Sequence, residues 1–506
     1  MTMTTLAVRG PQAVGYLDIA SLRRAFLVMA FVLAMVAPFT PDPLEFGVGA
    51  FVPWIVLVIA GTPTLPAALV YFLLWQWLQV FTRTLVGVTD GEPMARSLAG
   101  PWVINAYWYM LASVVVLAVA VRFVMGSLRP PAPREANAHL AWGPVELFQF
   151  YLFSLAAASA ARYLQDLVPA LDQPMEALAR VKSVAVFMLF VGVFSARRGF
   201  AYMLAAIAIE LVIGFSGVLG DFRSIFIFVF VAALAARVRW TATTTLAVTG
   251  AAMFLVVLGL FWTSVKNEYR QVSTGSDESQ YIKVPLDVRL GYLGRRVANA
   301  GDIDWGHASY LLLNRLAYVD IFGSVIGVKM VSPEEGSMRQ WSDALAHVFQ
   351  PRALFPGKPP LSDSEVFMRL ARADMSEQVR AGTSISVGYV SENFVDLGFP
   401  WMLGGIFVLG VLLATVCRYF MTIPAPWVMR EGTVLAIVYL VAQNGVEVSL
   451  PKMLGAMVMG FVVYAGLAKF AYPMAWRWLD RKAVSRRQTA VMKQRATASR
   501  RSPYEK

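Results

Sequence analysis

The stretch 351–360 places two basic side chains in a loop that proline makes stiff. It reads Pro-Arg-Ala-Leu-Phe-Pro-Gly-Lys-Pro-Pro, and proline both restricts φ and removes a backbone hydrogen-bond donor. Such a loop holds Arg352 and Lys358 in place without a helix. Guanidinium and ammonium groups bind oxyanions such as phosphate. The loop is therefore a candidate anion-binding element, although a rigid edge of a folded cap would explain its prolines equally well.

Carboxylates able to act as a general base follow and precede this loop. Glu392 and Asp396 are four residues apart in a segment that predicts a helix running into a membrane span. An acid facing lipid there would be costly, so we expect both to face a cavity or a partner, and Glu392 is the first candidate for the base. Asp320 is the second. It lies near Arg315, a candidate phosphate ligand, in the helical pattern 309–327, where ordinary surface charges are the alternative.

Two further polar groups lie at the ends of predicted spans. The tight turn 220–224 reads Gly-Asp-Phe-Arg-Ser and presents Arg223 where it can reach a phosphate. Gln443, Asn444 and Glu447 cluster at the end of another span and are candidates to line the same cavity.

The composition indicates whether the protein that carries these residues folds in water or in lipid. Of 506 residues, 58% are apolar and 15% are charged, and the mean hydropathy is +0.58. A soluble domain is about 45–50% apolar and about 25% charged, so a soluble globular enzyme is excluded and lipid is the expected solvent. One cysteine and three histidines argue against a disulfide, thiol-pair redox chemistry and a metal centre. We expect no metal and no cofactor.

Apolar runs predict an all-α polytopic membrane protein with about twelve transmembrane helices. The predicted organisation is 1–263 with nine spans, one large external segment at 264–397, 398–472 with three spans, and a basic cytoplasmic tail at 473–506. The spans are expected at 24–40, 46–61, 65–88, 102–125, 146–164, 182–196, 199–219, 224–237, 242–263, 398–420, 427–447 and 450–472.

The distribution of Lys and Arg predicts the orientation. Basic residues concentrate on the cytoplasmic side of membrane proteins, and the tail after residue 472 carries many of them against only Asp480 and Glu505. A cytoplasmic tail puts 264–397 outside and both termini inside. The net charge of +12 is then a topology signal and a contact with anionic lipid. We expect no nucleic-acid partner, because no basic-aromatic repeat or groove-reading motif is present.

The external segment mixes acids and bases with interleaved aromatic residues such as Trp305, Tyr310 and Trp341. Aromatic rings stack on sugar faces and guanidinium groups grip oxyanions, so this composition suits a carbohydrate that carries phosphate. A small folded cap with solvated charges is the alternative.

Three of these segments together resemble a known family. They are Gly-x-x-Arg-Ser at 220–224, Pro-Arg-x-Leu-Phe-Pro-x-Lys-Pro at 351–359 and Ser-x-Ser-x-Gly-Tyr-x-x-Glu-x-x-x-Asp-x-Gly at 384–398. Over about residues 200–420 the chain resembles the O-antigen polymerase (Wzy-like) group, also called oligosaccharide repeat unit polymerases. Many members have two sizeable external loops, whereas this chain has one large segment and a shorter one at 165–181.

The resemblance implies a GT-C-like inverting glycosyltransferase of the bacterial inner membrane. It would join undecaprenyl-diphosphate-linked repeat units at the outer face, in O-antigen, capsule or exopolysaccharide synthesis, with a chain-length regulator protein as a candidate partner. The implied site residues are Arg223, Arg352, Lys358 and Glu392. An Arg-x10-Gly pattern of some members adds Arg295, which precedes Gly306.

The expected mechanism is sugar transfer with a diphosphate lipid as the leaving group. Fixed cations, for which Arg223, Arg315, Arg352 and Lys358 are the candidates, would stabilise the charge on the diphosphate without a metal. Glu392, or Asp320 in its place, would take the proton of the acceptor hydroxyl. The alternatives are a transporter or flippase for lipid-linked oligosaccharide, an O-antigen ligase, and a non-catalytic assembly protein.

Overall fold

The computed structural model describes residues 17–97, 99–168, 171–216, 222–238, 241–274, 284–332, 338–350, 355, 357–358, 361–372 and 384–501. These residues form helices and no strand. The helices used below are α1 (Ile19–Val36), α2 (Pro43–Ala60), α3 (Ala67–Asp90), α4 (Trp102–Met125), α6 (Pro144–Leu167), α7 (Asp172–Ala179), α8 (Val181–Ala196), α9 (Phe200–Ser216), α10 (Arg223–Ala235), α11 (Ala242–Thr274), α12 (Leu286–Ala298), α13 (Trp305–Leu316), α14 (Val319–Val331), α15 (Arg339–Phe349), α16 (Asp363–Ala371), α18 (Tyr389–Leu397), α19 (Met402–Thr422), α20 (Trp427–Ala442) and α21 (Leu450–Arg501), with the 3-10 turn η6 (Gly445–Glu447).

Seven helical segments in the described residues are long and apolar enough to cross a membrane, or eight if the bent pair α13–α14 is one span. The expected all-α, multi-pass membrane architecture is therefore confirmed. Each of the twelve predicted spans contains a helix, but the number twelve stays a prediction. Helices α3 and α6 have 24 residues each and are not among the seven segments, and α9, α10 and α20 are short, with 17, 13 and 16 residues. The seven segments are Ile19–Phe39, Pro43–Ala60, Trp102–Met125, Asp172–Ala196, Thr249–Thr274, Met402–Thr422 and Leu450–Arg486.

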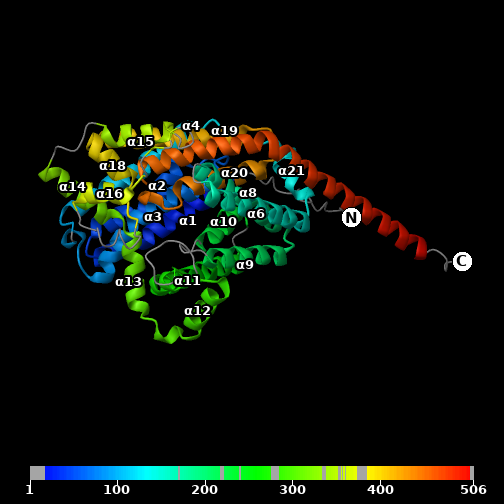
Figure 1. Cartoon of the computed structure of the whole chain (residues 1–506), viewed down its shortest axis with the longest axis horizontal. Helices are drawn as coiled ribbons and strands as arrows, with labels where there is room; N and C mark the ends of the chain where they lie inside the picture. The colour runs from blue at the N-terminus through cyan, green and yellow to red at the C-terminus, as the bar shows by residue number, and fades with distance from the viewer. Residues whose placement is uncertain are drawn as a thin grey trace, which may run out of the picture.

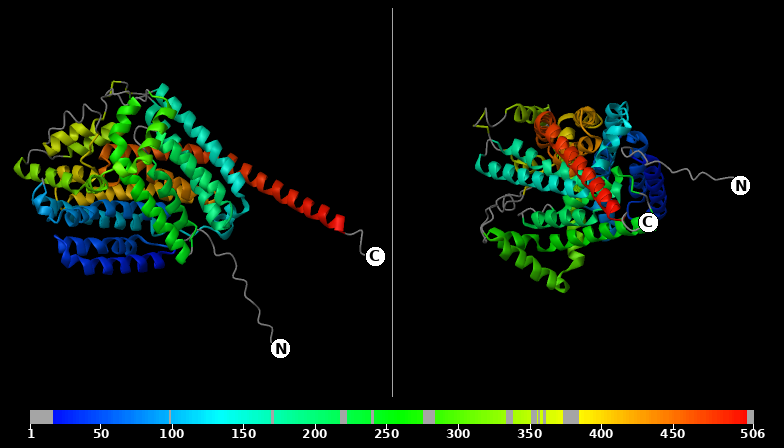
Figure 2. Two further views of the ribbon diagram at one scale, coloured as in Figure 1. Left: turned by 90° about the horizontal axis from the view of Figure 1, so that it is seen from below. Right: turned by 90° about the vertical axis from the view of Figure 1, so that its right-hand side faces the viewer.

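The outermost helices present apolar side chains to their surroundings. On α1, Val28 is 64% exposed and Met35 is 69% exposed, and Phe123 of α4 is 72% exposed. Exposed large side chains at this density suit contact with lipid rather than water. In Figure 2, α1 and α2 lie side by side at one edge of the bundle. The Arg23 side chain joins them by donating to the carbonyl oxygens of Leu57 and Gly61 at 2.9 and 2.8 Å.

The centre of the bundle contains α8 and α20, which pack on each other. Every residue of α8 from Ser183 to Val193 is buried, and nearly all of α20 is buried as well. A helix that is apolar on nearly all sides belongs inside a protein or a membrane, which suits α8 and, apart from its buried Arg430 and Glu431, α20.

The described part of 264–397 packs against the bundle as a set of short helices. Helices α13 and α14 meet at 51°, and α14 lies so close to α4 that a Cβ atom at Gly323 would stand 3.1 Å from the backbone nitrogen of Val103. Helix α15 packs on α18 and α21. Figure 1 shows α11, α12 and α13 on one side of the molecule, and α21 extending well beyond the body.

Candidate functional site

A cavity of about 3200 Å³ runs along α3, α10 and α11. Its lining on α11 reaches from Ala251 to Arg270, which corresponds to roughly 29 Å at about 1.5 Å per residue. The two ends of the cavity differ in chemistry from its middle. We call one end the polar end, the middle the apolar groove and the other end the far end. The polar end lies near Arg223, Lys266, Arg270 and Arg315.

The apolar groove is the middle of the cavity. Its walls come from α1, α10 and α11, and they carry aliphatic and aromatic side chains. The far end holds Asp18, Arg197, Arg237 and Thr241. The groove residues include Leu22, Phe26, Phe226, Phe230, Ala252 and Leu255.

Three cations converge at the polar end, and we call them the cation triad. Lys266 and Arg270 lie one turn apart on α11, and Arg315 lies on α13. Each of the two arginines is close enough to act electrostatically on Lys266, and Arg315 also acts on Arg270. Among the residues that the structure describes, no member of the triad forms an ion pair, and the buried Nε of Arg270 has no hydrogen-bond acceptor. Like charges held this way repel one another, which favours binding of an anion.

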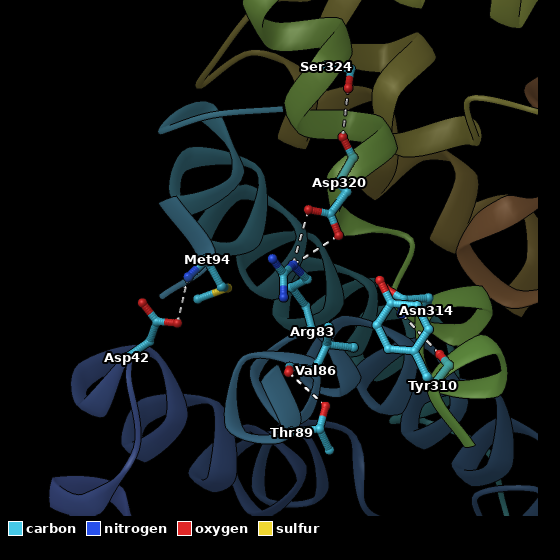
Figure 3. A network of polar contacts seen from close by, with 9 residues as sticks. All are labelled: Asp42, Arg83, Val86, Thr89, Met94, Tyr310, Asn314, Asp320 and Ser324. Atoms are coloured by element: carbon cyan, nitrogen blue, oxygen red, sulfur yellow. Dashed lines mark hydrogen bonds and ion pairs between the residues drawn. The ribbon is translucent and has the colours of Figure 1, made fainter. Parts of the chain in front are cut away.

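A further cation, Arg83 of α3, joins the polar end to α14. Its Nε lies 2.9 Å from Oδ2 and 3.1 Å from Oδ1 of Asp320 (Figure 3). The Arg83 side chain is only 6% exposed, and its Nη1 has no partner within the described part of the chain. The pair therefore fixes α14 against α3 at the mouth of the cavity.

The floor of the polar end is built by two segments without α-helix that meet. The first is 384–388, and the second is Gln443–Ser449, which contains η6. The backbone N–H of Tyr389 donates to the carbonyl oxygen of Val448 at 2.7 Å. Gly388 has φ +82° and lies directly against the carbonyl of Val446, so any side chain there would clash. Irregular backbone of this kind is tolerated at membrane depth where it lines a cavity.

Three of the predicted site residues line the cavity. Arg315 belongs to the triad, Asp320 is paired with Arg83, and the Arg223 guanidinium donates to Oδ1 of Asn444 at 2.9 Å. Gln443, Asn444 and Glu447, which the sequence places at the end of one predicted span, also line it.

The structure does not bring Glu392 to the cavity. Its side chain is 2% exposed, and Oε2 accepts a 2.5 Å hydrogen bond from the backbone N–H of Leu450, the first residue of α21. Burial raises the pKa of Glu392 to about 8, and the negative charges of Asp363 and Asp396 act in the same direction. Glu392 is thus placed as a cap of α21.

The remaining predicted residues lie elsewhere. Lys358 donates to the backbone carbonyl oxygens of His347 and Gln350, and Arg295 is exposed on α12. Neither lines the cavity. Arg352 lies outside the described residues.

Sequence reasoning missed Lys266, Arg270 and Arg83 as site residues. One signal was present for the first two, because they are four residues apart directly after an apolar run and therefore share a helix face. Nothing in the sequence placed Arg83 opposite Asp320, since 237 residues separate them.

The described residues contain no group of three or more His, Cys, Asp or Glu side chains arranged to hold a metal ion. No protein-family model matches the chain, and comparison with curated proteins and with solved structures gives no match either.

Proposed function

We propose that this protein is a membrane glycosyltransferase that polymerises oligosaccharide repeat units carried on undecaprenyl diphosphate. The observation that carries the proposal is the cation triad at one end of a long apolar groove. A diphosphate on a polyprenyl chain has the matching chemistry, because it combines a compact negative headgroup with a long apolar tail.

The chemistry follows from where charge develops. When the bond between the sugar and the diphosphate breaks, negative charge grows on the departing phosphate oxygen. Preorganised cations stabilise that charge by several kcal/mol in a cavity with little water. Lys266, Arg270 and Arg315 have this role in the proposal, and Arg223 supports them from α10. Arg352 stays a candidate on the basis of the family resemblance.

The cellular arrangement is part of the same proposal. Twelve spans, with both termini in the cytoplasm, would put the polar end at the outer face of a bacterial inner membrane. The basic part of α21 supports this orientation, since basic residues stay on the cytoplasmic side. A GT-C-like fold and a chain-length regulator as partner are carried over from the family resemblance only.

The test is to incubate the purified protein in detergent with an undecaprenyl-diphosphate-linked repeat unit. We expect products with two or more units joined and the release of undecaprenyl diphosphate. A matched reaction uses a variant in which Lys266 and Arg315 are both replaced by Gln, and it should give no elongation. Absence of elongation with folded wild-type protein and the correct repeat unit would overturn the proposal.

A transporter or flippase for lipid-linked oligosaccharide is the second candidate. One observation favours it: the cavity continues past the groove to the arginines of the far end, Arg197 and Arg237. The apolar walls between the two ends oppose it, because a charged sugar headgroup would lose its hydration while crossing them. Transport without elongation in sealed vesicles would support this second candidate, whereas elongation in detergent requires a transferase.

A further inference from the structure

The carboxylates that line the polar end differ in whether their oxygens are already in use. Asp320 is paired with Arg83. Asp363 accepts a hydrogen bond from Oγ of Ser449 at 2.9 Å and lies 2.6 Å from Nζ of Lys452. Glu447 contrasts with both, because its side chain has no hydrogen bond and no ion pair with any residue that the structure describes.

The position of Glu447 is held by its backbone neighbours. The amide of Gln79 accepts from the N–H of Val446 at 2.8 Å and donates to the carbonyl oxygen of Asn444 at 3.1 Å. The next residue, Val448, accepts from the N–H of Tyr389. These contacts tie η6 to α3 and to the start of α18, so a reacting group here would have a defined place.

The charges around Glu447 come from several elements. Arg223 on α10 and Arg315 on α13 both stabilise its negative charge, although neither is within ion-pair distance. Tyr318, between α13 and α14, also faces it, and Asp363 with its partner Lys452 lines the same end. Glu447 and both arginines line the same cavity, so a substrate bound there can contact the carboxylate and the cations. Glu447 is half-buried, and its place among charged groups in a cavity is typical of a functional residue.

We propose that Glu447, and not Glu392, is the general base that accepts the proton of the acceptor hydroxyl. This inference depends on the proposed function. In the step, the hydroxyl oxygen forms a bond to the anomeric carbon, and its proton moves to an oxygen of Glu447. The bond from the anomeric carbon to the diphosphate breaks, and its electron pair leaves with the phosphate oxygen next to the cation triad. The protonated Glu447 then returns the proton to water.

The experiment compares Glu447→Gln with the wild type and with Glu365→Gln. Glu365 is an exposed residue of α16 that does not line the cavity, so its variant controls for the removal of one carboxylate. Removal of a general base lowers the turnover number by about 10²–10⁴-fold. We expect this loss for Glu447→Gln only, with binding of the undecaprenyl-diphosphate-linked unit within about threefold of the wild type.

The pH profile separates a chemical role from a structural one. Wild-type turnover should fall on the acid side as Glu447 becomes protonated, and Glu447→Gln should lack this acid limb. If the wild type elongates and Glu447→Gln does so within about threefold, or retains the acid limb, the assignment of Glu447 is wrong while the proposed function stands. If the folded wild type does not elongate at all, the proposed function itself fails.

Discussion

At the scale of single residues, the cation triad combines an energetic cost with a binding role. Its three positive side chains form no ion pair within the described part of the chain, and their mutual repulsion opposes folding. An anion with two or more negative charges removes that cost when it binds. Residues of a binding site are often kept at such a cost to stability.

Arg315→Ala tests this balance. We expect the affinity for the lipid diphosphate to fall by about 10- to 100-fold, as expected for loss of one hydrogen bond between charged groups. The melting temperature of the unliganded protein should stay equal or rise, because one repulsive charge is gone. Titration calorimetry and a thermal melt measure the two effects.

The control for Arg315→Ala is Arg339→Ala. Arg339 is exposed on α15, where it forms an ion pair with Asp343 at 3.7 Å, and its replacement should change neither quantity. Unchanged affinity in Arg315→Ala would remove this residue from the anion site.

Glu392 and Asp396 illustrate how an acid can look catalytic in a sequence and be structural in the fold. Glu392 accepts from the first backbone N–H of α21, and Asp396 accepts from the N–H groups of Gln340 and Trp341 at the start of α15. Helix N-termini stabilise nearby negative charge and leave N–H groups in need of acceptors. The two acids therefore join α18 to two other helices.

The buried carboxyl of Glu392 predicts a pH dependence of stability. Its pKa in the folded protein is raised from 4.5 to about 8, so between these values the folded state holds a proton that the unfolded state releases. The free energy of unfolding should therefore fall as the pH rises through this window. Glu392→Gln cannot titrate, and its melting temperature should decline less between pH 5 and pH 8 than that of the wild type. Parallel curves for the two proteins would contradict the buried, protonated state.

At the scale of elements, the floor of the cavity depends on a backbone that only glycine can supply. Gly388 and Gly445 both have positive φ, +82° and +65°. A side chain on the first would meet the carbonyl of Val446, and one on the second would meet the amide of Gln79. The two segments thus approach each other by backbone contact, which sets the position of Glu447 next to α3.

Gly388→Ala should be strongly destabilising. A positive φ at a residue other than glycine destabilises the folded state by about 1–3 kcal/mol. The clash with the Val446 carbonyl adds to this, because a backbone group cannot move aside as a flexible side chain can. Gly404→Ala on α19 is the matched control, since nothing lies within 4 Å of its Cβ position and alanine favours a helix. Thermal melts in detergent should show a clear loss for the first and none for the second. Equal melting temperatures would mean that the floor is built differently.

At the scale of the whole molecule, the long cavity predicts a preference for long lipid carriers. Ala252→Trp on α11 would fill part of the apolar groove. We expect it to reduce elongation of undecaprenyl-linked units by at least about tenfold. Units on a prenyl chain too short to reach from the polar end to residue 252 should be used at nearly the wild-type rate. Met253→Trp is the control, because Met253 is 62% exposed and does not line the cavity. Equal losses on both carriers would show that the groove does not hold the tail.

The orientation of the whole chain can be tested with single cysteines. The one native thiol, Cys417, is buried, so the wild type should react little with a membrane-impermeant maleimide. In intact cells we expect Asp343→Cys on α15 to be labelled, and Lys482→Cys on α21 to be labelled only after lysis. The reverse pattern would put the proposed site on the cytoplasmic side, where the proposed reaction does not occur.

The sequence by itself determined the class of molecule. Its apolar runs predicted where helices form, because helix formation and burial in lipid depend on local composition. The ends were missed where a helix continues past its apolar part, as in α11, which runs to Thr274, and α21, which runs to Arg501. The same local logic placed Arg223 and the 443–447 group at the ends of predicted spans, and Arg315 inside the helical pattern 309–327, which suffices to name candidates for a cavity.

Only the tertiary structure decided which candidates meet. Pairing of Arg83 with Asp320, convergence of Lys266 and Arg270 on Arg315, and capping of α21 by Glu392 all join residues from different elements. Such contacts depend on how helices pack, and packing is set by side-chain shape over the whole bundle rather than by spacing along the chain. For the same reason, an acid whose spacing suggested catalysis became a helix cap, whereas the carboxylate of Glu447 lines the cavity without an ion pair to any residue that the structure describes.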